Sequence, residues 1–210
     1  MNRVVYLHGF ASGPSSSKAR FFRGALEAAG MEVVVPDLAA GDFEHLTLTG
    51  QMRVIERSTA GGSCALMGSS MGGYLAALYA ARHPEISRLV LLAPAFDFVG
   101  RWNERAGAAE IEEWRRKGSA EVYHYGEGRN CALHYGLMED AAQYEPWPDF
   151  RQPALIFHGA HDEVVPAELS QEFATGRPHV QLEIVDSGHE LLNVLEEIGP
   201  KVVEFLREGS

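Results

Sequence analysis

Six short runs of hydrophobic residues recur along the chain, and each run ends in residues that favour turns. Within a run the apolar side chains follow one another instead of alternating with polar ones, as in RLVLLAP at 88–94. Strands of this kind are covered on both faces, which is typical of a parallel sheet. We therefore expect six buried strands, at residues 3–9, 31–37, 63–68, 88–94, 153–159 and 180–186.

Helical patterns separate these strands. Gly30 ends the first helical pattern, and Pro200 is expected to restart a last helix directly after Gly199, because proline is favoured in a first helical turn. Strands that alternate with helices predict a doubly wound α/β fold with a mainly parallel six-stranded sheet. The helices are expected at residues 18–30, 71–84, 166–176 and 200–209.

Residues 97–150 interrupt this alternation, because the segment after the fourth strand is too long for a single crossover. It holds all three tryptophans, and it contains a short amphipathic pattern at 107–118 and a hairpin pattern around 126–130. Two interpretations stay open: a small insert or lid over one edge of the sheet, or a satellite core around an ordinary long loop. We expect residues 1–210 to form a single domain that includes this insert.

Composition narrows the classes of partner. The formal net charge of -11 disfavours nucleic acid and anionic membrane surfaces as partners. Cys64 and Cys131 form no C-x-x-C pair, and Cys64 lies in an apolar run that predicts a buried packing residue. A strand pattern begins within four residues of the start, which leaves no room for a secretory leader and predicts a cytoplasmic protein. No stretch reaches 18 apolar residues.

The stretch GSSMGG at 68–73 carries the first chemical signal. A sharp turn between a strand and a helix can expose a nucleophile, but it needs small residues two positions before and two after that nucleophile. Only Ser70 has glycine at both places, Gly68 and Gly72. Ser70 also follows an expected strand and precedes an expected helix, whereas Ser69 is interpreted as a small polar filler inside the turn.

Two further residues complete a pattern of nucleophile, acid and base. Asp162 follows the fifth strand in HGAHDEVVP, and His189 follows the sixth in VDSGHELL. Functional groups in such sheets lie beyond the carboxyl ends of the strands, so Ser70, Asp162 and His189 are expected to meet there. Asp97, after the fourth strand, stays open as an alternative acid. Asp162 has a structural alternative, in which it caps the helix near 166.

This order of serine, acid and histidine resembles the α/β-hydrolase superfamily over nearly the whole chain, from HGF near the start to GHE near the end. The chain is most similar to the small bacterial esterases of the YqiA type, which also begin with a strand and an LHGF-like turn. The resemblance implies Ser70 as nucleophile, Asp162 as orienting acid and His189 as general base. It also implies an oxyanion hole built from the backbone N–H groups of Phe10 and Met71, and the strand order 2-1-3-4-5-6.

The resemblance implies a serine hydrolase that cleaves carboxylic esters or thioesters of small molecules, with no cofactor and no metal. Histidines near strand ends, His8, His158 and His161, are interpreted as loop braces and not as metal ligands. A serine peptidase or acyltransferase with the same triad is an alternative. So is a binding protein without catalysis, because a fold does not guarantee an activity.

Overall fold

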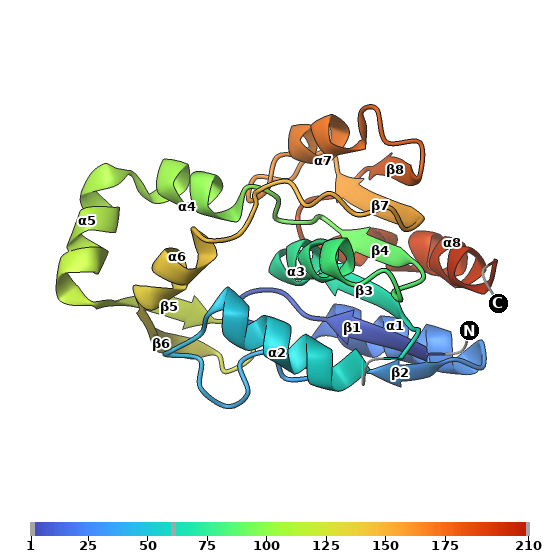
Figure 1. Ribbon diagram of the computed structural model, residues 1–210, viewed down its shortest axis with the longest axis horizontal. Coiled ribbons are helices and arrows are strands. Elements are labelled where there is room, and N and C mark those ends of the chain that lie inside the picture. Colours follow the sequence, from blue (N-terminus) through green and yellow to red (C-terminus); the bar gives the residue numbers. More distant parts are fainter. Residues whose placement is uncertain (1–2, 60–61, 209–210) are drawn as a thin grey trace.

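The computed structural model describes residues 3–59 and 62–208, and its centre is a six-stranded parallel sheet (Figure 1). The strand order is β2-β1-β3-β4-β7-β8, and every pairing in this sheet is parallel. This confirms the doubly wound α/β fold and the strand order that the resemblance implied. The strands are β1 (Arg3–Leu7), β2 (Glu32–Val34), β3 (Ala65–Ser69), β4 (Leu89–Leu92), β7 (Ala154–Gly159) and β8 (Val180–Val185).

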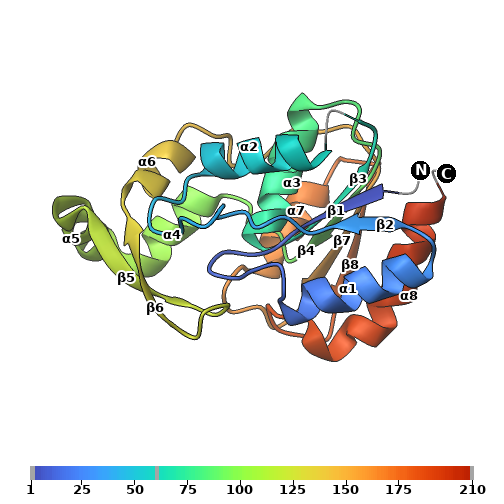
Figure 2. The ribbon, with the colours of Figure 1, turned by 90° about the horizontal axis from the view of Figure 1, so that it is seen from below.

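Helices cover both faces of the sheet (Figure 2). One face packs against the first and last helices, α1 (Ser17–Ala28) and α8 (Leu195–Arg207). The other face packs against α2 (Leu48–Thr59), α3 (Met71–Arg82) and α7 (Ala167–Ala174). The sheet is therefore the middle of three layers.

The two-sided cover explains the uninterrupted apolar runs. In β4, Leu89 and Leu91 belong to the core on the side of α3, while Val90 and Leu92 belong to the core on the side of α1. All four residues are fully buried. A strand with one face in water would need polar residues at alternate positions, and this strand has none.

The last helix differs from the expectation. α8 begins at Leu195 and continues through Gly199 and Pro200, instead of restarting at Pro200. Proline removes one backbone hydrogen bond inside a helix. However, Leu195 and Ile198 are buried on the N-terminal side of Pro200 and stabilise the earlier turns against the sheet. Gly209, the expected end of this helix, lies outside the described residues.

The segment between β4 and β7 contains more structure than the sequence indicated. The amphipathic pattern forms α5 (Ala108–Lys117), and the hairpin pattern forms β5 (Ser119–His124) and β6 (Arg129–His134), which pair antiparallel. Three helices were not predicted from the sequence: α4 (Phe98–Ala106), α6 (Gly136–Ala141) and, earlier in the chain, α2. Within residues 3–59 and 62–208, every helix falls short of the length and hydropathy that a bilayer span requires.

This inserted segment touches the loops that leave the sheet after β1 and β2. The backbone N–H of Gly126, at the hairpin turn, donates to the carbonyl of Ala11 at 3.4 Å. The N–H of His134 donates to the carbonyl of Glu44 at 2.7 Å. The insert therefore lies beyond the carboxyl ends of the strands, where ligands bind in folds of this class (Figure 1).

Candidate active site

Ser70 occupies the sharp turn between β3 and α3. Its backbone angles are φ 54° and ψ -119°, which lie in a region that residues other than glycine rarely adopt. Such a conformation costs about 1–3 kcal/mol and persists only where neighbours enforce it. Here the Ser70 N–H donates to the carbonyl of Leu92 at 2.8 Å, and the Ser70 carbonyl accepts from the N–H groups of Gly73 and Ala95. The turn leaves Ser70 partly exposed, while Ser69 is buried.

The glycines around Ser70 are required by close backbone contacts. A Cβ atom on Gly68 would lie 2.2 Å from the carbonyl oxygen of Gly72. A Cβ atom on Gly72 would lie 2.2 Å from the carbonyl oxygen of Leu7. Because real Cβ atoms do not approach backbone atoms so closely, the G-x-S-x-G spacing reflects the packing of the turn on β1 and β3.

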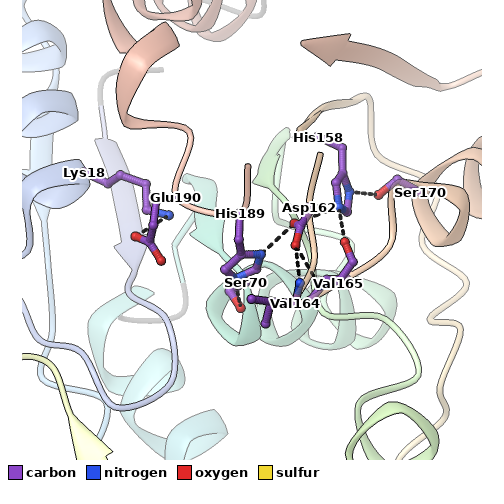
Figure 3. Close-up of polar contacts among 9 residues, drawn as sticks. All are labelled: Lys18, Ser70, His158, Asp162, Val164, Val165, Ser170, His189 and Glu190. Atoms are coloured by element: carbon purple, nitrogen blue, oxygen red, sulfur yellow. Dashed lines mark hydrogen bonds and ion pairs between the residues drawn. The ribbon is translucent and has the colours of Figure 1, made fainter. Parts of the chain in front are cut away.

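His189 and Asp162 extend a line of hydrogen bonds from Ser70 (Figure 3). The Nε2 atom of His189 lies 3.0 Å from Ser70 Oγ, and its Nδ1 atom lies 2.7 Å from Asp162 Oδ2. The loops after β7 and β8 hold these two side chains together. A Cβ atom on Gly159 would lie 2.3 Å from the carbonyl oxygen of Ser187, so the two loops touch where β7 ends.

The Asp162 carboxylate is buried and fully engaged. Its Oδ1 accepts from the backbone N–H groups of Val164 at 2.9 Å and Val165 at 2.8 Å, and its Oδ2 faces His189 and His158. Burial alone would raise the pKa of Asp162, but hydrogen bonds from the two histidines and from Val165 hold this pKa well below its usual range. The carboxylate is therefore ionised, and it acts only as an acceptor.

The expected oxyanion turn lies beside Ser70. A Cβ atom on Gly9, the residue before Phe10, would lie 3.5 Å from Ser70 Cβ. Within the described part of the chain, neither the Phe10 N–H nor the Met71 N–H donates a hydrogen bond to the protein. Both amides are thus free of hydrogen bonds to the described part of the protein.

The alternative acid, Asp97, takes a different position. It is the N-cap residue of α4, with a left-handed backbone, and the His189 ring is paired with Asp162 instead. Glu163, next to Asp162, is exposed. Of these three carboxylates, only Asp162 forms a hydrogen bond with His189.

The three remaining strand-end histidines all make hydrogen bonds with the protein, His8 and His161 with loop residues and His158 with Val165 and with Ser170 of α7. His8 is buried; its Nε2 accepts from the Leu38 N–H at 3.1 Å, and its Nδ1 donates to the Gly9 carbonyl at 3.0 Å. Burial lowers the pKa of His8. His161 is exposed and pairs with Asp186 at 2.9 Å. His158 is fully buried behind Asp162.

Aromatic side chains link the insert to the Phe10 turn. The Phe10 ring contacts Trp102 of α4, with ring centroids 5.1 Å apart, and Phe43 at 5.6 Å. Phe43 in turn packs against His124 of the hairpin at 4.6 Å. No sequence pattern connects the tryptophans of the insert with Phe10.

Lys18 is a charged residue near the His189 loop that was not predicted from the sequence. It lies in the first turn of α1, two residues after Ser16, which caps this helix by accepting from the Ala19 N–H at 3.3 Å. The Lys18 side chain is only 10% exposed, and its Nζ lies 3.7 Å from Glu190, the residue after His189 (Figure 3). Burial lowers the pKa of Lys18, although Glu190 opposes this effect.

Comparisons with known proteins agree with the fold. The model of an uncharacterised protein family, UPF0227, matches residues 3–207. Alpha/beta hydrolase domain-containing protein 10 from mouse has a TM-score of 0.83 at 19% identity, over 99% of this chain and 90% of that chain. Est1E from Butyrivibrio proteoclasticus has a TM-score of 0.76 at 22% identity, over 99% of this chain and 88% of that chain. A monoacylglycerol lipase from Paleococcus ferrophilus has a TM-score of 0.75 at 19% identity, over 99% of this chain and 95% of that chain. No curated protein sequence matches the chain.

Proposed function

The chain belongs to the UPF0227 family within the α/β-hydrolase superfamily, and from this premise we propose that it is a serine hydrolase of small carboxylic esters or thioesters. The observation that carries the proposal is the line of hydrogen bonds from Asp162 Oδ2 through His189 to Ser70 Oγ, with distances of 2.7 and 3.0 Å. Nucleophile, base and orienting group within hydrogen-bond reach are the signature of an activated serine.

The low pKa of Asp162 decides the roles of the two His189 nitrogens. An ionised carboxylate only accepts hydrogen bonds, so Nδ1 of His189 carries the proton that faces it. In the neutral ring, Nε2 then presents its lone pair to the Ser70 hydroxyl. The imidazole is therefore oriented to act as a general base toward Ser70.

In the proposed reaction, Ser70 Oγ attacks the carbonyl carbon of the substrate while His189 Nε2 takes the hydroxyl proton. The carbonyl oxygen becomes negatively charged and accepts hydrogen bonds from the N–H groups of Phe10 and Met71. Each such donor is worth about 3–4 kcal/mol of transition-state stabilisation in known enzymes. His189 then passes its proton to the departing alcohol or thiol, which leaves an acyl group on Ser70.

Water completes the cycle by the same chemistry. His189 takes a proton from the water, the hydroxide attacks the acyl carbonyl, and the proton returns to Ser70 Oγ as the carboxylic acid leaves. Asp162 holds the ring and stabilises its positive charge in both halves.

The structural neighbours support a small-molecule substrate. One structure of Est1E has ferulic acid bound, and the Paleococcus protein is a monoacylglycerol lipase. We accordingly propose acyl esters or thioesters over peptides as substrates of this chain.

Covalent labelling tests the proposal. A fluorophosphonate reacts with an activated serine, and peptide mass spectrometry then identifies the modified residue. We expect one adduct per chain, on Ser70, which is lost in Ser70→Ala and in His189→Ala. Ser69→Ala is a matched control, because Ser69 is the adjacent serine but is buried at the end of β3. A folded wild type without an adduct would contradict a catalytic function and favour a binding protein.

A further inference from the structure

His158 lies directly behind the acid of the candidate triad. Its side chain is completely buried, and its Nε2 atom lies 3.2 Å from Asp162 Oδ2 and 2.8 Å from the carbonyl oxygen of Val165. Its other nitrogen, Nδ1, lies 2.7 Å from the Oγ atom of Ser170, which is also completely buried. The mechanism proposed above uses neither His158 nor Ser170.

The partners of His158 determine where its proton sits. The Val165 carbonyl can only accept a hydrogen bond, so Nε2 must carry a hydrogen atom. In a neutral ring, Nδ1 is then an acceptor, and the Ser170 hydroxyl donates to it. Ser170 belongs to α7, so a helix holds one side of the ring and the Val165 carbonyl holds the other.

The Nε2 atom of His158, which donates to the Val165 carbonyl, also lies 3.2 Å from Asp162 Oδ2, the same oxygen that faces His189 (Figure 3). Asp162 Oδ1 is held by the N–H groups of Val164 and Val165. A carboxylate bound at both oxygens cannot rotate about its side-chain bonds without breaking one of these contacts. The direction from which Oδ2 meets His189 is therefore set by the groups behind it.

We propose that His158, oriented by Ser170, is a positioning residue that fixes Asp162 Oδ2 toward the His189 base. This inference rests on the proposed hydrolase function. His158 acts through Asp162 and touches neither the substrate nor the Ser70 hydroxyl. Loss of its N–H should slow acylation of Ser70 without changing how substrate binds. Outer hydrogen-bond partners of metal ligands contribute about 10- to 100-fold, and we expect a loss of the same size here.

A purely structural role is the competing explanation, because the same hydrogen bonds join the end of β7 to α7. The two roles differ in what they change. A structural defect lowers the fraction of chains that are folded and reactive. A positioning defect lowers the rate constant of each reactive chain.

The test compares His158→Phe, which keeps a ring of similar size without an N–H group, with His158→Gln, whose amide nitrogen can replace Nε2. Ser170→Ala removes the hydroxyl that orients the ring and leaves His158 in place. His161→Phe and His161→Gln are matched controls, because His161 is exposed in the same loop and pairs with Asp186. The readouts are the rate constant and final extent of fluorophosphonate labelling at Ser70, and kcat and KM with p-nitrophenyl butyrate.

We expect His158→Phe to lower the labelling rate constant and kcat by about 10- to 100-fold, with one adduct per chain at the end and a KM within about twofold of the wild type. His158→Gln should recover most of this loss, and Ser170→Ala should show a smaller loss of the same kind. The His161 variants should react like the wild type. If His158→Phe does not fold, His158→Gln and Ser170→Ala decide the test: a lower rate constant in Ser170→Ala supports the proposal, and wild-type rate constants in both overturn it.

A wild-type rate constant in folded His158→Phe, or a loss only in the fraction of labelled chains, would overturn the positioning role while leaving the hydrolase intact. A wild type that acquires no adduct on Ser70 would overturn the hydrolase function and this inference together. The two failures are therefore distinguishable.

Discussion

The first turn of α3 rests on the end of β1 so closely that a Cβ atom on Gly72 would stand 2.2 Å from the carbonyl oxygen of Leu7. The same atom would stand 2.6 Å from the carbonyl oxygen of His8. This contact brings Met71, in the first turn of α3, and Phe10, just after β1, to the same edge of the sheet as Ser70. The candidate oxyanion hole depends on this close approach of two backbones.

Gly72→Ala should therefore damage both the fold and the site. Forcing a methyl group into a packed contact typically costs about 1–3 kcal/mol, and here the neighbours are backbone atoms that cannot move alone. We expect a free energy of unfolding in urea lower by about this amount, and esterase activity lower by more than about 10-fold because the Phe10 and Met71 amides separate.

Gly24→Ala is the matched control for this substitution. Gly24 lies inside α1, and a Cβ atom there meets nothing within 4 Å. Alanine is favoured over glycine in a helix by about 0.5–1 kcal/mol, so this variant should be slightly more stable than the wild type and equally active. Equal stabilities of the two alanine variants would contradict the close approach.

The sheet was predictable because its inner strands β1, β3, β4 and β7 are buried on two sides, which leaves uninterrupted apolar runs in the sequence, and because the edge strands β2 and β8 keep shorter runs of the same kind. The helices that were not predicted, α2, α4 and α6, have no comparable apolar run in the sequence. α6 has only six residues and begins with Gly136, and α2 carries Gly50 within a largely polar sequence. These segments are helical because they pack against the sheet or against each other, and tertiary packing of this kind is not visible in local propensity.

The candidate triad was predictable for a different reason. Ser70, Asp162 and His189 each follow a strand, and the carboxyl ends of parallel strands converge at one edge. The contacts of His158 with Ser170 and of Trp102 with Phe10 follow no such rule. They join segments whose relative placement depends on side-chain packing, so only the three-dimensional structure brings them out.

Asp162→Asn should abolish most of the activity. An asparagine can turn its amide N–H toward His189 and thereby favour the wrong tautomer of the ring. In a serine protease, the equivalent change lowers kcat by about 10⁴-fold, and we expect a loss of about 10³- to 10⁴-fold with a p-nitrophenyl ester.

Two other acidic residues provide the controls for Asp162→Asn. Glu163→Gln changes an exposed residue next in sequence, and Asp97→Asn changes the alternative acid at the start of α4. Both variants should keep activity within about threefold of the wild type, which is roughly 0.7 kcal/mol in the activation barrier. A loss in Asp97→Asn as large as in Asp162→Asn would contradict the assignment of the acid.

The Asp162 carboxylate should also make the free energy of unfolding depend on pH. The pKa of Asp162 is lower in the folded protein than the ordinary value near 4 that it has in the unfolded chain. Ionised Asp162 therefore stabilises the fold fully above about pH 4, and this contribution is lost as the pH falls below that value. Urea unfolding at pH 7, 5, 4 and 3 should show the free-energy difference between wild type and Asp162→Asn shrinking below pH 4. A difference that stays constant down to pH 3 would contradict the lowered pKa.

Trp102→Ala should show whether the insert supports the active site. The Trp102 ring lies between Phe10, at 5.1 Å, and Trp114, at 5.6 Å, so it joins the packing of the insert to the candidate oxyanion turn. Its removal frees the Phe10 turn to move, and we expect kcat to fall by about 10-fold, less than the 10²- to 10³-fold that complete loss of one oxyanion donor costs.

Tyr125→Ala separates this effect from a general disturbance of the insert. Tyr125 is 78% exposed at the hairpin turn, and its ring contacts Tyr123. This variant should keep the wild-type kcat and KM with the p-nitrophenyl ester. If Trp102→Ala raised KM and left kcat unchanged, the ring would instead belong to the surface that binds the acyl group, since uniform binding affects KM alone. Wild-type kinetics in both variants would mean that residues 97–150 pack beside the site without supporting the Phe10 turn.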